Sequence, residues 1–138
     1  MEITTKGRNA VRIMADIARH NDVFVSLSDI VTRQRISIKY AEKIIAMLVK
    51  GGCLISMRGK NGGYKLSREA KNISVNQILI ATGDEVKLDT CLRKNCARAG
   101  QCENMGVWNT LASLIDNYLD GVTLQDLIDK TYHKIKFN

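Results

Sequence analysis

Apolar residues recur every three or four positions along much of the chain, a spacing that predicts amphipathic α-helices. The clearest stretch runs from Ile38 to Lys50 and stops at Gly51-Gly52. The residues expected on its buried side are Ile38, Ala41, Ile44, Ile45, Leu48 and Val49, and those on its outer side are Lys39, Glu42, Lys43 and Ala46. Further helices are predicted over residues 8–19, 28–33, 74–82 and 123–130, and a long one over about 107–122.

Two short β-compatible runs, at residues 53–57 and 64–67, flank a turn that reads Arg58-Gly59-Lys60-Asn61-Gly62-Gly63. This pattern predicts a hairpin with a positively charged tip. Helix, short helix, helix and basic hairpin, in that order, describe a winged helix-turn-helix, so the predicted fold is mainly α with a small β-hairpin. In such a fold the helix after the tight turn enters the major groove and the wing lies along the DNA backbone. We therefore assign residues 1–83 to a DNA-binding region.

The long helix carries more apolar surface than one small domain easily covers. Residues 103–138 are therefore predicted to form a dimerisation helix and a C-terminal segment within the same compact domain, and residues 84–102 a cysteine-bearing loop. A two-fold homodimer would present two DNA-binding regions to matched DNA half-sites. The alternative is that the long helix packs only on its own domain. The stripe concerned is Val107, Leu111, Leu114, Ile115, Tyr118 and Val122, with Trp108 beside it.

Length and composition favour one folded domain: 138 residues, of which 45% are hydrophobic and 25% charged. A chain of this size has little room for an enclosed catalytic cleft, so a sensor or binding module is expected rather than an enzyme. A cysteine-dependent redox enzyme is the alternative, but Cys-x-x-Cys and a convincing general base are missing. No apolar run approaches the roughly 18 residues of a membrane span, so we expect a cytoplasmic protein without membrane contact.

Positive charge is concentrated in the first half of the chain. Residues 1–70 contain 13 Lys and Arg against 6 Asp and Glu, whereas residues 71–138 contain 8 of each class. A one-sided basic region is typical of a surface that binds a polyanion, because each neutralised phosphate releases a counterion. Double-stranded DNA is the favoured partner, and a basic surface that only maintains solubility is the alternative.

Three of the four cysteines, Cys91, Cys96 and Cys102, have the spacing C-x4-C-x5-C beside several cations. Thiolates this close together can converge on one soft metal centre, either zinc or an iron–sulfur cluster. Unligated or redox-active thiols are the alternative. The fourth, Cys53, lies at a helix–strand junction and is predicted to be a small buried apolar side chain.

Five segments together resemble the IscR/NsrR/CymR-type family of winged-helix transcription regulators, over nearly the whole chain. They are Met1–Arg8, Ile36–Ile44, the wing Arg58–Tyr64, the three loop cysteines and Asn117–Leu127. The resemblance implies a homodimeric repressor that binds operator DNA. It further implies an iron–sulfur cluster, held by Cys91, Cys96 and Cys102, whose state sets the affinity for DNA.

The same resemblance implies a set of DNA contacts. Glu42 would accept a hydrogen bond from a cytosine amino group, and Lys39 would reach guanine or a phosphate. Ser28 and Ser37 would contact phosphate through hydroxyl groups or helix N-terminal amides, unless they are only caps. The complete predicted set is Ser28, Ser37, Lys39, Tyr40, Glu42, Lys43, Arg58 and Lys60, with a solvated helix face as the alternative for Lys39 and Glu42.

The fourth cluster ligand is left open by two departures from the family pattern. Met105 stands where one branch has a histidine, three residues after the last cysteine, and Arg8 stands where another branch supplies an acidic residue. The open candidates are Asp89, Glu103, Asn104, Met105, an exogenous thiol or water. The cluster type, 2Fe-2S or 4Fe-4S, is also open, and zinc or no metal is the alternative.

Overall fold

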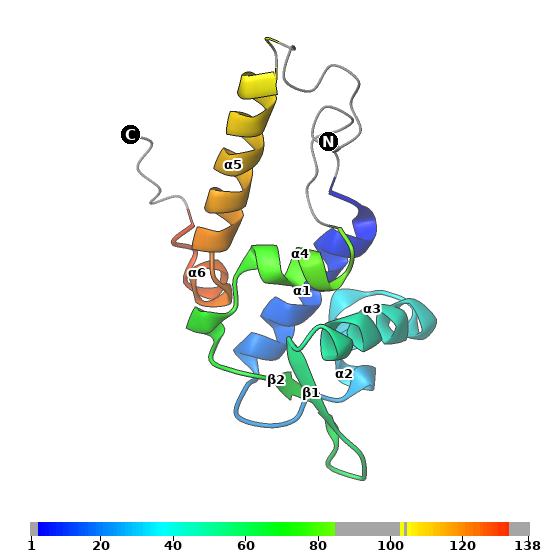
Figure 1. Ribbon diagram of the computed structural model, residues 1–138. Coiled ribbons are helices and arrows are strands. Elements are labelled where there is room, and N and C mark those ends of the chain that lie inside the picture. Colours follow the sequence, from blue (N-terminus) through cyan, green and yellow to red (C-terminus); the bar gives the residue numbers. More distant parts are fainter. Residues whose placement is uncertain (1–2, 85–102, 104, 133–138) are drawn as a thin grey trace.

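The computed structural model describes residues 3–84, 103 and 105–132. Within these ranges, three helices precede an antiparallel hairpin, as the sequence pattern predicts. A short 3-10 helix and three more helices follow the hairpin. The elements are α1 (Thr5–Arg19), α2 (Leu27–Gln34), α3 (Ile38–Lys50), β1 (Leu54–Met57), β2 (Gly63–Leu66), η1 (Ala70–Asn72), α4 (Val75–Ala81), α5 (Met105–Gly121) and α6 (Leu124–Asp129). The hairpin and α5 project in opposite directions from the body formed by the other helices (Figure 1).

One apolar core joins α1, α3, α4, the hairpin and α6. Ile13, Ile17, Ile44 and Leu48 are fully buried in it, and Ile44 and Leu48 confirm the buried side predicted for α3 at these positions. Leu124 of α6 joins the same core. Residues 122–124 are held there by backbone bonds, since Val75 N donates to Val122 O at 2.8 Å and Leu124 N donates to Ile73 O at 2.9 Å.

Side-chain caps set the starts of the two helices of the helix-turn-helix. Ser26 Oγ accepts from Asp29 N at 3.1 Å, so α2 begins at Leu27, one residue earlier than predicted. Ser37 Oγ accepts from Tyr40 N at 3.2 Å and starts α3. Between them Arg35 adopts left-handed dihedrals, with φ 54°. The prediction that Ile38 is buried is wrong: it is 56% exposed, because the first turn of α3 extends past the edge of the core.

The wing is anchored by a third segment of chain. β1 and β2 pair with Ser56 opposite Tyr64 and Met57 opposite Gly63. Val25 and Tyr64 exchange two backbone hydrogen bonds of 2.8 Å, which attaches the hairpin to the segment just before α2. Gly63 has φ 147°, and a Cβ there would collide with the Val25 carbonyl oxygen. Glycine is therefore required at this position.

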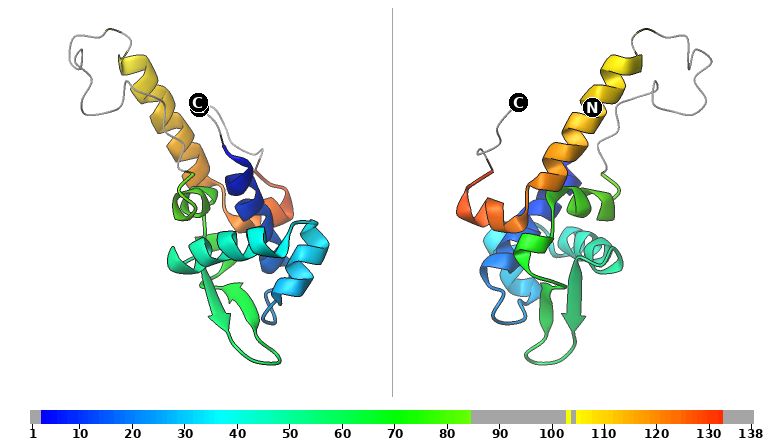
Figure 2. Two further views of the ribbon diagram at one scale, coloured as in Figure 1. Left: turned by 90° about the vertical axis from the view of Figure 1, so that its right-hand side faces the viewer. Right: turned by 60° about the vertical axis from the view of Figure 1, so that its left-hand side comes forward.

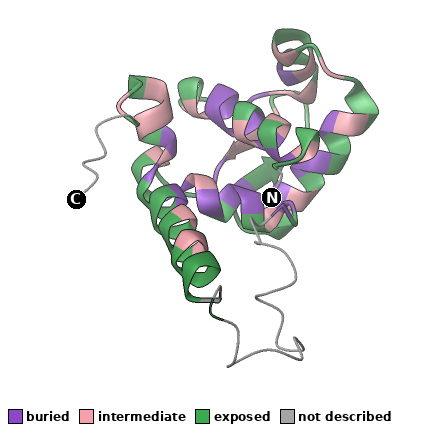
Figure 3. Cartoon of the chain, turned by 90° about the horizontal axis from the view of Figure 1, so that it is seen from above, coloured by how far each residue is buried: buried purple, intermediate pink, exposed green. Residues whose placement is uncertain are grey.

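Helix α5 buries only part of its apolar surface within the chain. Leu119 packs against Leu79, and Asn76 Nδ2 donates to Asp120 Oδ1 at 2.8 Å, which joins α4 to α5. Most of the rest of α5 is exposed when the chain is seen from above (Figure 3). Its exposed large apolar side chains are Val107 (61%), Trp108 (41%), Leu114 (61%) and Tyr118 (41%).

Candidate nucleic-acid interface

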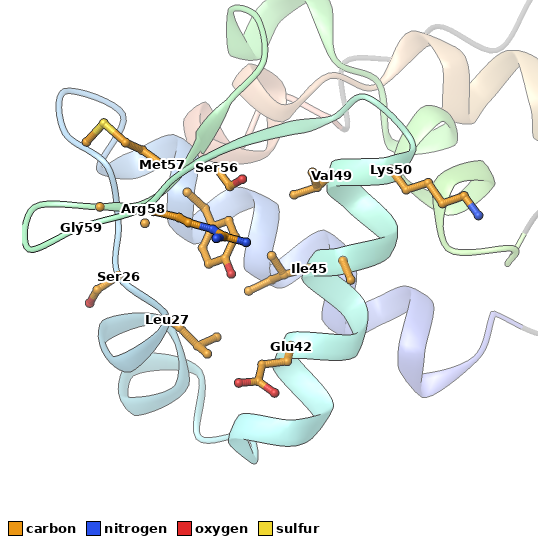
Figure 4. A pocket seen from close by; sticks show the side chains of 14 residues that line it. Ser26, Leu27, Glu42, Ile45, Val49, Lys50, Ser56, Met57, Arg58 and Gly59 are labelled. Carbon is orange, nitrogen blue, oxygen red and sulfur yellow. The ribbon is translucent and has the colours of Figure 1, made fainter.

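Helix α3 and the hairpin enclose an open groove of about 620 Å³. Arg58 reaches from the hairpin into the space between hairpin and helix, and Glu42 projects from α3 at one end of it (Figure 4). Both side chains line the groove, and no ion pair of the described residues includes either of them. A basic and an acidic group are therefore free to meet complementary groups of a ligand that enters between helix and wing.

The predicted residues of α3 take two different positions. Lys39, Glu42 and Lys43 are exposed, and of the three only Glu42 lines the groove, so the two lysines flank it. Tyr40 is half-buried and packs against the core, which leaves part of its surface for contact. The structure thus brings Glu42 and Arg58 to one groove and places Lys39 and Lys43 on the exposed side of the same helix.

The two predicted serines differ in role. Ser37 is the cap of α3, and its hydroxyl is already engaged with the backbone of Tyr40. Ser28 is exposed within the first turn of α2 and is not a cap, because Ser26 fills that role. The Ser28 hydroxyl is therefore not committed to capping, although its carbonyl oxygen accepts from Thr32 Oγ1 at 2.8 Å.

Lys60 lies near the tip of the wing, away from the groove that holds Arg58. It lines a second hollow, of about 640 Å³, on the side of the wing that faces the segment before α2, together with Phe24 and Asp29. Arg58 and Lys60, the two basic residues of the hairpin turn, thus line different hollows of the surface.

Sequence reasoning missed four polar residues of the groove, one of which is Ser26, the cap of α2. Ser56 and Tyr64 are cross-strand partners on the face of the hairpin that looks toward α3, and Lys50 ends that helix. The alternation of side chains along a strand was the available signal for Ser56 and Tyr64, because paired residues share one face of the sheet.

One cation of the helix-turn-helix is withdrawn from any DNA surface. Arg33 donates to the buried Asp16 of α1, with Nη2 at 2.7 Å from Oδ1. Burial alone would raise the pKa of Asp16, but hydrogen bonds from Arg33 and Gln34, and the charge of Arg33, outweigh it and hold that pKa below its usual value. The ion pair also raises the pKa of Arg33.

The predicted metal ligands Cys91, Cys96 and Cys102 lie outside the described residues, as do Asp89 and Asn104. Cys53 is 1% exposed, which confirms it as a small core side chain, and burial raises the pKa of its thiol against the opposing charge of Arg68.

The residue that immediately precedes the cysteine segment is held against the N-terminus of α1. Asp84 is 7% exposed, and its Oδ2 accepts from Thr4 N at 2.8 Å. A Cβ on Gly7 would collide with the same carboxylate, so glycine is needed for this approach. Asp84 is therefore fixed against the first turn of α1.

Comparisons with known proteins agree with this geometry. Residues 3–130 match the Rrf2 family, described as an iron-dependent transcriptional regulator. The chain is 38% identical over 130 residues to the HTH-type transcriptional regulator IscR of Photobacterium profundum, covering 93% of this chain and 76% of that protein. It is 37% identical over 131 residues to IscR of Yersinia pseudotuberculosis, covering 94% and 80%.

Solved structures show the same fold. The global cysteine regulator CymR of B. subtilis superposes with a TM-score of 0.80 and 26% identity, covering 94% of this chain and 98% of that one. IscR of T. potens superposes with a TM-score of 0.76 and 31% identity, covering 100% and 94%. Both the family match and these relatives span nearly all of the chain, which therefore belongs to the Rrf2 family of DNA-binding transcription regulators and is not an enzyme.

Proposed function

We propose that the chain acts as a homodimeric, cytoplasmic transcription repressor whose affinity for operator DNA is set by an iron–sulfur cluster. The observation that carries the DNA-binding part is the groove between α3 and the wing, which Glu42 and Arg58 both line and where neither forms an ion pair with a described residue. None of the described helices combines the length and apolar character needed to cross a bilayer.

In the proposed complex, α3 enters the major groove. Glu42 accepts from a cytosine amino group, and Lys39 and Lys43 on the same exposed side reach guanine or phosphate. Arg58 and Lys60 meet phosphates on either side of the wing, where the glycine-rich turn allows a close approach. Ser28 and the amides at the start of α3 behind Ser37 add phosphate contacts, and Tyr40 contributes its exposed edge.

The proposed dimer forms through α5. Val107, Leu114 and Tyr118 lie on one stripe at helical spacing and are all more than 40% exposed, whereas the neighbouring stripe with Leu119 is covered by this chain. A second copy related by a two-fold axis would cover the exposed stripe on both helices at once and fix the separation of the two DNA-binding regions.

The proposed cluster ligands are Cys91, Cys96 and Cys102. Three thiolates at this spacing form a soft donor set that suits iron–sulfur chemistry, and nearby Arg93, Lys94 and Arg98 favour the ionised thiols. When bound, the cluster supplies a centre that responds to iron, oxygen or nitric oxide. Zinc ligation, or oxidation of the free thiols, is the second candidate function of the same segment.

The route from the cysteine segment to DNA runs through Asp84. This residue immediately precedes the segment and holds the N-terminus of α1 through Thr4. Helix α1 in turn holds α2 through Asp16 and Arg33. A conformational change in the cysteine segment that displaces Asp84 would therefore shift α1 and, through the Asp16–Arg33 pair, the helix-turn-helix. Regulation requires the ligand to favour one of two such arrangements.

Binding selection from fragmented genomic DNA tests the proposal. The protein is purified anaerobically, divided into loaded and metal-stripped samples, and assayed for absorption, iron, sulfide and zinc. We expect one selected duplex bound by two protomers, iron and sulfide in the loaded sample, and a difference in affinity that the Cys91→Ser, Cys96→Ser and Cys102→Ser triple variant abolishes. Colourless protein containing zinc would favour the second candidate. No selected duplex in either sample would refute operator binding.

A further inference from the structure

A second site of positive charge lies away from the groove, where α6 packs beside α1 (Figure 2). A hollow of about 450 Å³ opens between α1, the last residue of α2 and the end of α6. Its volume falls within the roughly 300–1,000 Å³ typical of small-molecule sites.

Three cations from two separate segments surround this hollow. Arg12 and Arg19 are seven residues apart on α1 and so share one face of the helix, and Lys130 follows α6. Among the described residues that line it there is no carboxylate. Uncompensated positive charge in one concave place raises the local concentration of anions.

These cations form only weak interactions with other described residues, or none. Arg12 donates to Gln34 O and Asn9 Oδ1, both at 3.4 Å, which are long hydrogen bonds. Arg19 and Lys130 form no side-chain hydrogen bond or ion pair with any other residue that the structure describes. An anion entering the hollow would therefore displace little.

The wall between the cations is apolar. Val11 and Leu127 are half-buried and Ala15 is 7% exposed, so a patch of aliphatic surface separates Arg12 and Arg19 from Lys130. An inorganic ion would leave this apolar surface exposed to water. An anion with an apolar body would cover it, and burial of the two apolar surfaces would stabilise the complex.

We propose that this hollow, which Gln34 and Tyr132 line together with the three cations and the aliphatic wall, binds a small organic anion that combines a carboxylate or phosphate with an apolar body. The hollow is distinct from the groove between α3 and the hairpin, since no residue of either element lines it. Residues 133–138 include Lys134 and Lys136 and no acidic side chain, so none of their side chains supplies such an anion.

The site contacts the helix-turn-helix directly. Gln34 lines it, and the Gln34 side chain donates to Asp16 Oδ2 at 2.7 Å, beside the Arg33 pair that fixes α2. Arg12 holds the Gln34 carbonyl oxygen. A ligand that displaces Gln34 would act on the end of α2 through the hydrogen bond to Asp16, which gives occupancy of the hollow a physical path to the helix-turn-helix.

Methyl NMR of the full-length protein, without DNA, tests this inference. Phenyl phosphate is titrated as the probe, with inorganic phosphate and benzyl alcohol as the probes that carry only the charge or only the apolar body. We expect saturable shifts of the Val11, Ala15 and Leu127 methyl signals with phenyl phosphate and much weaker ones with the other two. Absence of a saturable shift at these methyl groups would overturn the proposal.

Charge-removing variants sharpen the test. Arg19→Gln together with Lys130→Asn should weaken phenyl phosphate binding about tenfold, as expected for the loss of two solvent-accessible charge contacts. Asparagine is chosen because residue 130 has φ 55°, which asparagine tolerates. Lys71→Gln, which removes an exposed ammonium elsewhere, should leave binding unchanged. Equal weakening by Lys71→Gln would mean unspecific attraction and would overturn the site.

A DNA titration of the same variants distinguishes a ligand site from an extension of the DNA surface. The Arg19→Gln, Lys130→Asn double variant should keep the DNA affinity and salt slope of the parent. A salt slope lowered by about two units would assign the hollow to DNA phosphates and refute the small-ligand proposal. The NMR result does not depend on operator binding, so failure of either proposal is seen separately.

Discussion

Arg33 and Asp16 form a two-pronged ion pair between α2 and α1: Arg33 Nη2 lies 2.7 Å from Oδ1, and Arg33 Nε lies 3.1 Å and 3.0 Å from Oδ1 and Oδ2. Gln34 Nε2 adds a hydrogen bond of 2.7 Å to Oδ2. The carboxylate is only 3% exposed, and besides these groups of α2 it faces His20, whose Nδ1 lies 3.8 Å from Oδ1. The orientation of the helix-turn-helix thus depends on one buried side chain of α1.

Removal of the guanidinium should destabilise the fold. We expect Arg33→Met to lower the free energy of unfolding by about 2–3 kcal/mol, less than for a fully buried pair because the Arg33 side chain is 35% exposed. Urea denaturation measures the change. Arg19→Met, which removes an exposed arginine of α1, is the control and should cost under about 0.5 kcal/mol. Equal stability of the two variants would show that the ion pair contributes nothing net.

Acid should weaken the same contact. The folded-state pKa of Asp16 lies below its usual value, because the hydrogen bonds from α2 outweigh the effect of burial. The resulting stabilisation is present above the unfolded-state pKa of about 3.9 and is lost as the pH falls through the lower folded-state value.

Urea denaturation at pH 6 and at pH 3.5 checks this dependence. The parent should lose more stability between the two values than Asp16→Asn, which carries no titrating group at this position. Some slope should persist in the variant, because the pKa of Asp126 is also lowered, chiefly by the backbone hydrogen bond of Thr123 and then by the Thr131 hydroxyl. An Asp16→Asn variant that is as acid-sensitive as its parent would contradict the assignment.

The wing should be sensitive to alanine at one glycine and tolerant at another. Gly63→Ala places a Cβ against the Val25 carbonyl oxygen, whereas Gly59 has φ 115° with open space around it. We expect a loss of at least about 2 kcal/mol for Gly63→Ala and about 1 kcal/mol for Gly59→Ala, where only backbone strain arises. Amide exchange of Val25 and Tyr64 would locate the damage. Similar losses in both would mean that the close approach at Gly63 relaxes without cost.

Basic residues on the proposed DNA surface should contribute to the salt dependence of binding. Arg58→Ala and Lys39→Ala should each weaken binding to the selected duplex and lower the magnitude of the salt slope by about one unit. Fluorescence anisotropy at several salt concentrations measures both quantities. Lys71→Ala, outside the proposed surface, should change neither. If both surface variants bind as the parent does, the docking of α3 and the wing is wrong.

A charge on the exposed stripe of α5 should separate the protomers. Leu114→Glu places a carboxylate where the proposed partner helix packs, so light scattering should report a monomer in place of a dimer. Asn109→Glu adds the same charge at an exposed position on the side of α5 opposite this stripe and should leave the dimer intact. A monomeric parent, or a Leu114→Glu variant that stays dimeric, would exclude this stripe as the interface.

Much of the fold follows from local chemistry. Ser37, Ser74 and Thr123 each cap a helix by accepting from a backbone amide three residues ahead, so each cap is visible as a short sequence pattern. The glycine-rich turn after Met57 likewise predicts the hairpin. These interactions span only a few residues, and the order of elements in the winged helix was therefore predictable before any tertiary contact was known.

The roles of particular side chains were not predictable in the same way. Arg33 and Lys39 are both cations of the helix-turn-helix, but Arg33 pairs with a carboxylate 17 residues earlier and Lys39 faces outward. Ile38 has the periodicity of a core residue and is nevertheless exposed, because none of the described elements extends over the first turn of α3.

The sequence by itself determined the helices, their caps, the basic wing and the three-cysteine spacing, because these depend on neighbours within about one helical turn. The tertiary structure decided which cations remain free, which half of α5 is covered, and that α6 returns to α1 to form the hollow with Arg12 and Lys130. Those outcomes depend on how long-range packing distributes a limited apolar core among elements distant in the chain, and such packing has no periodic signature in the sequence.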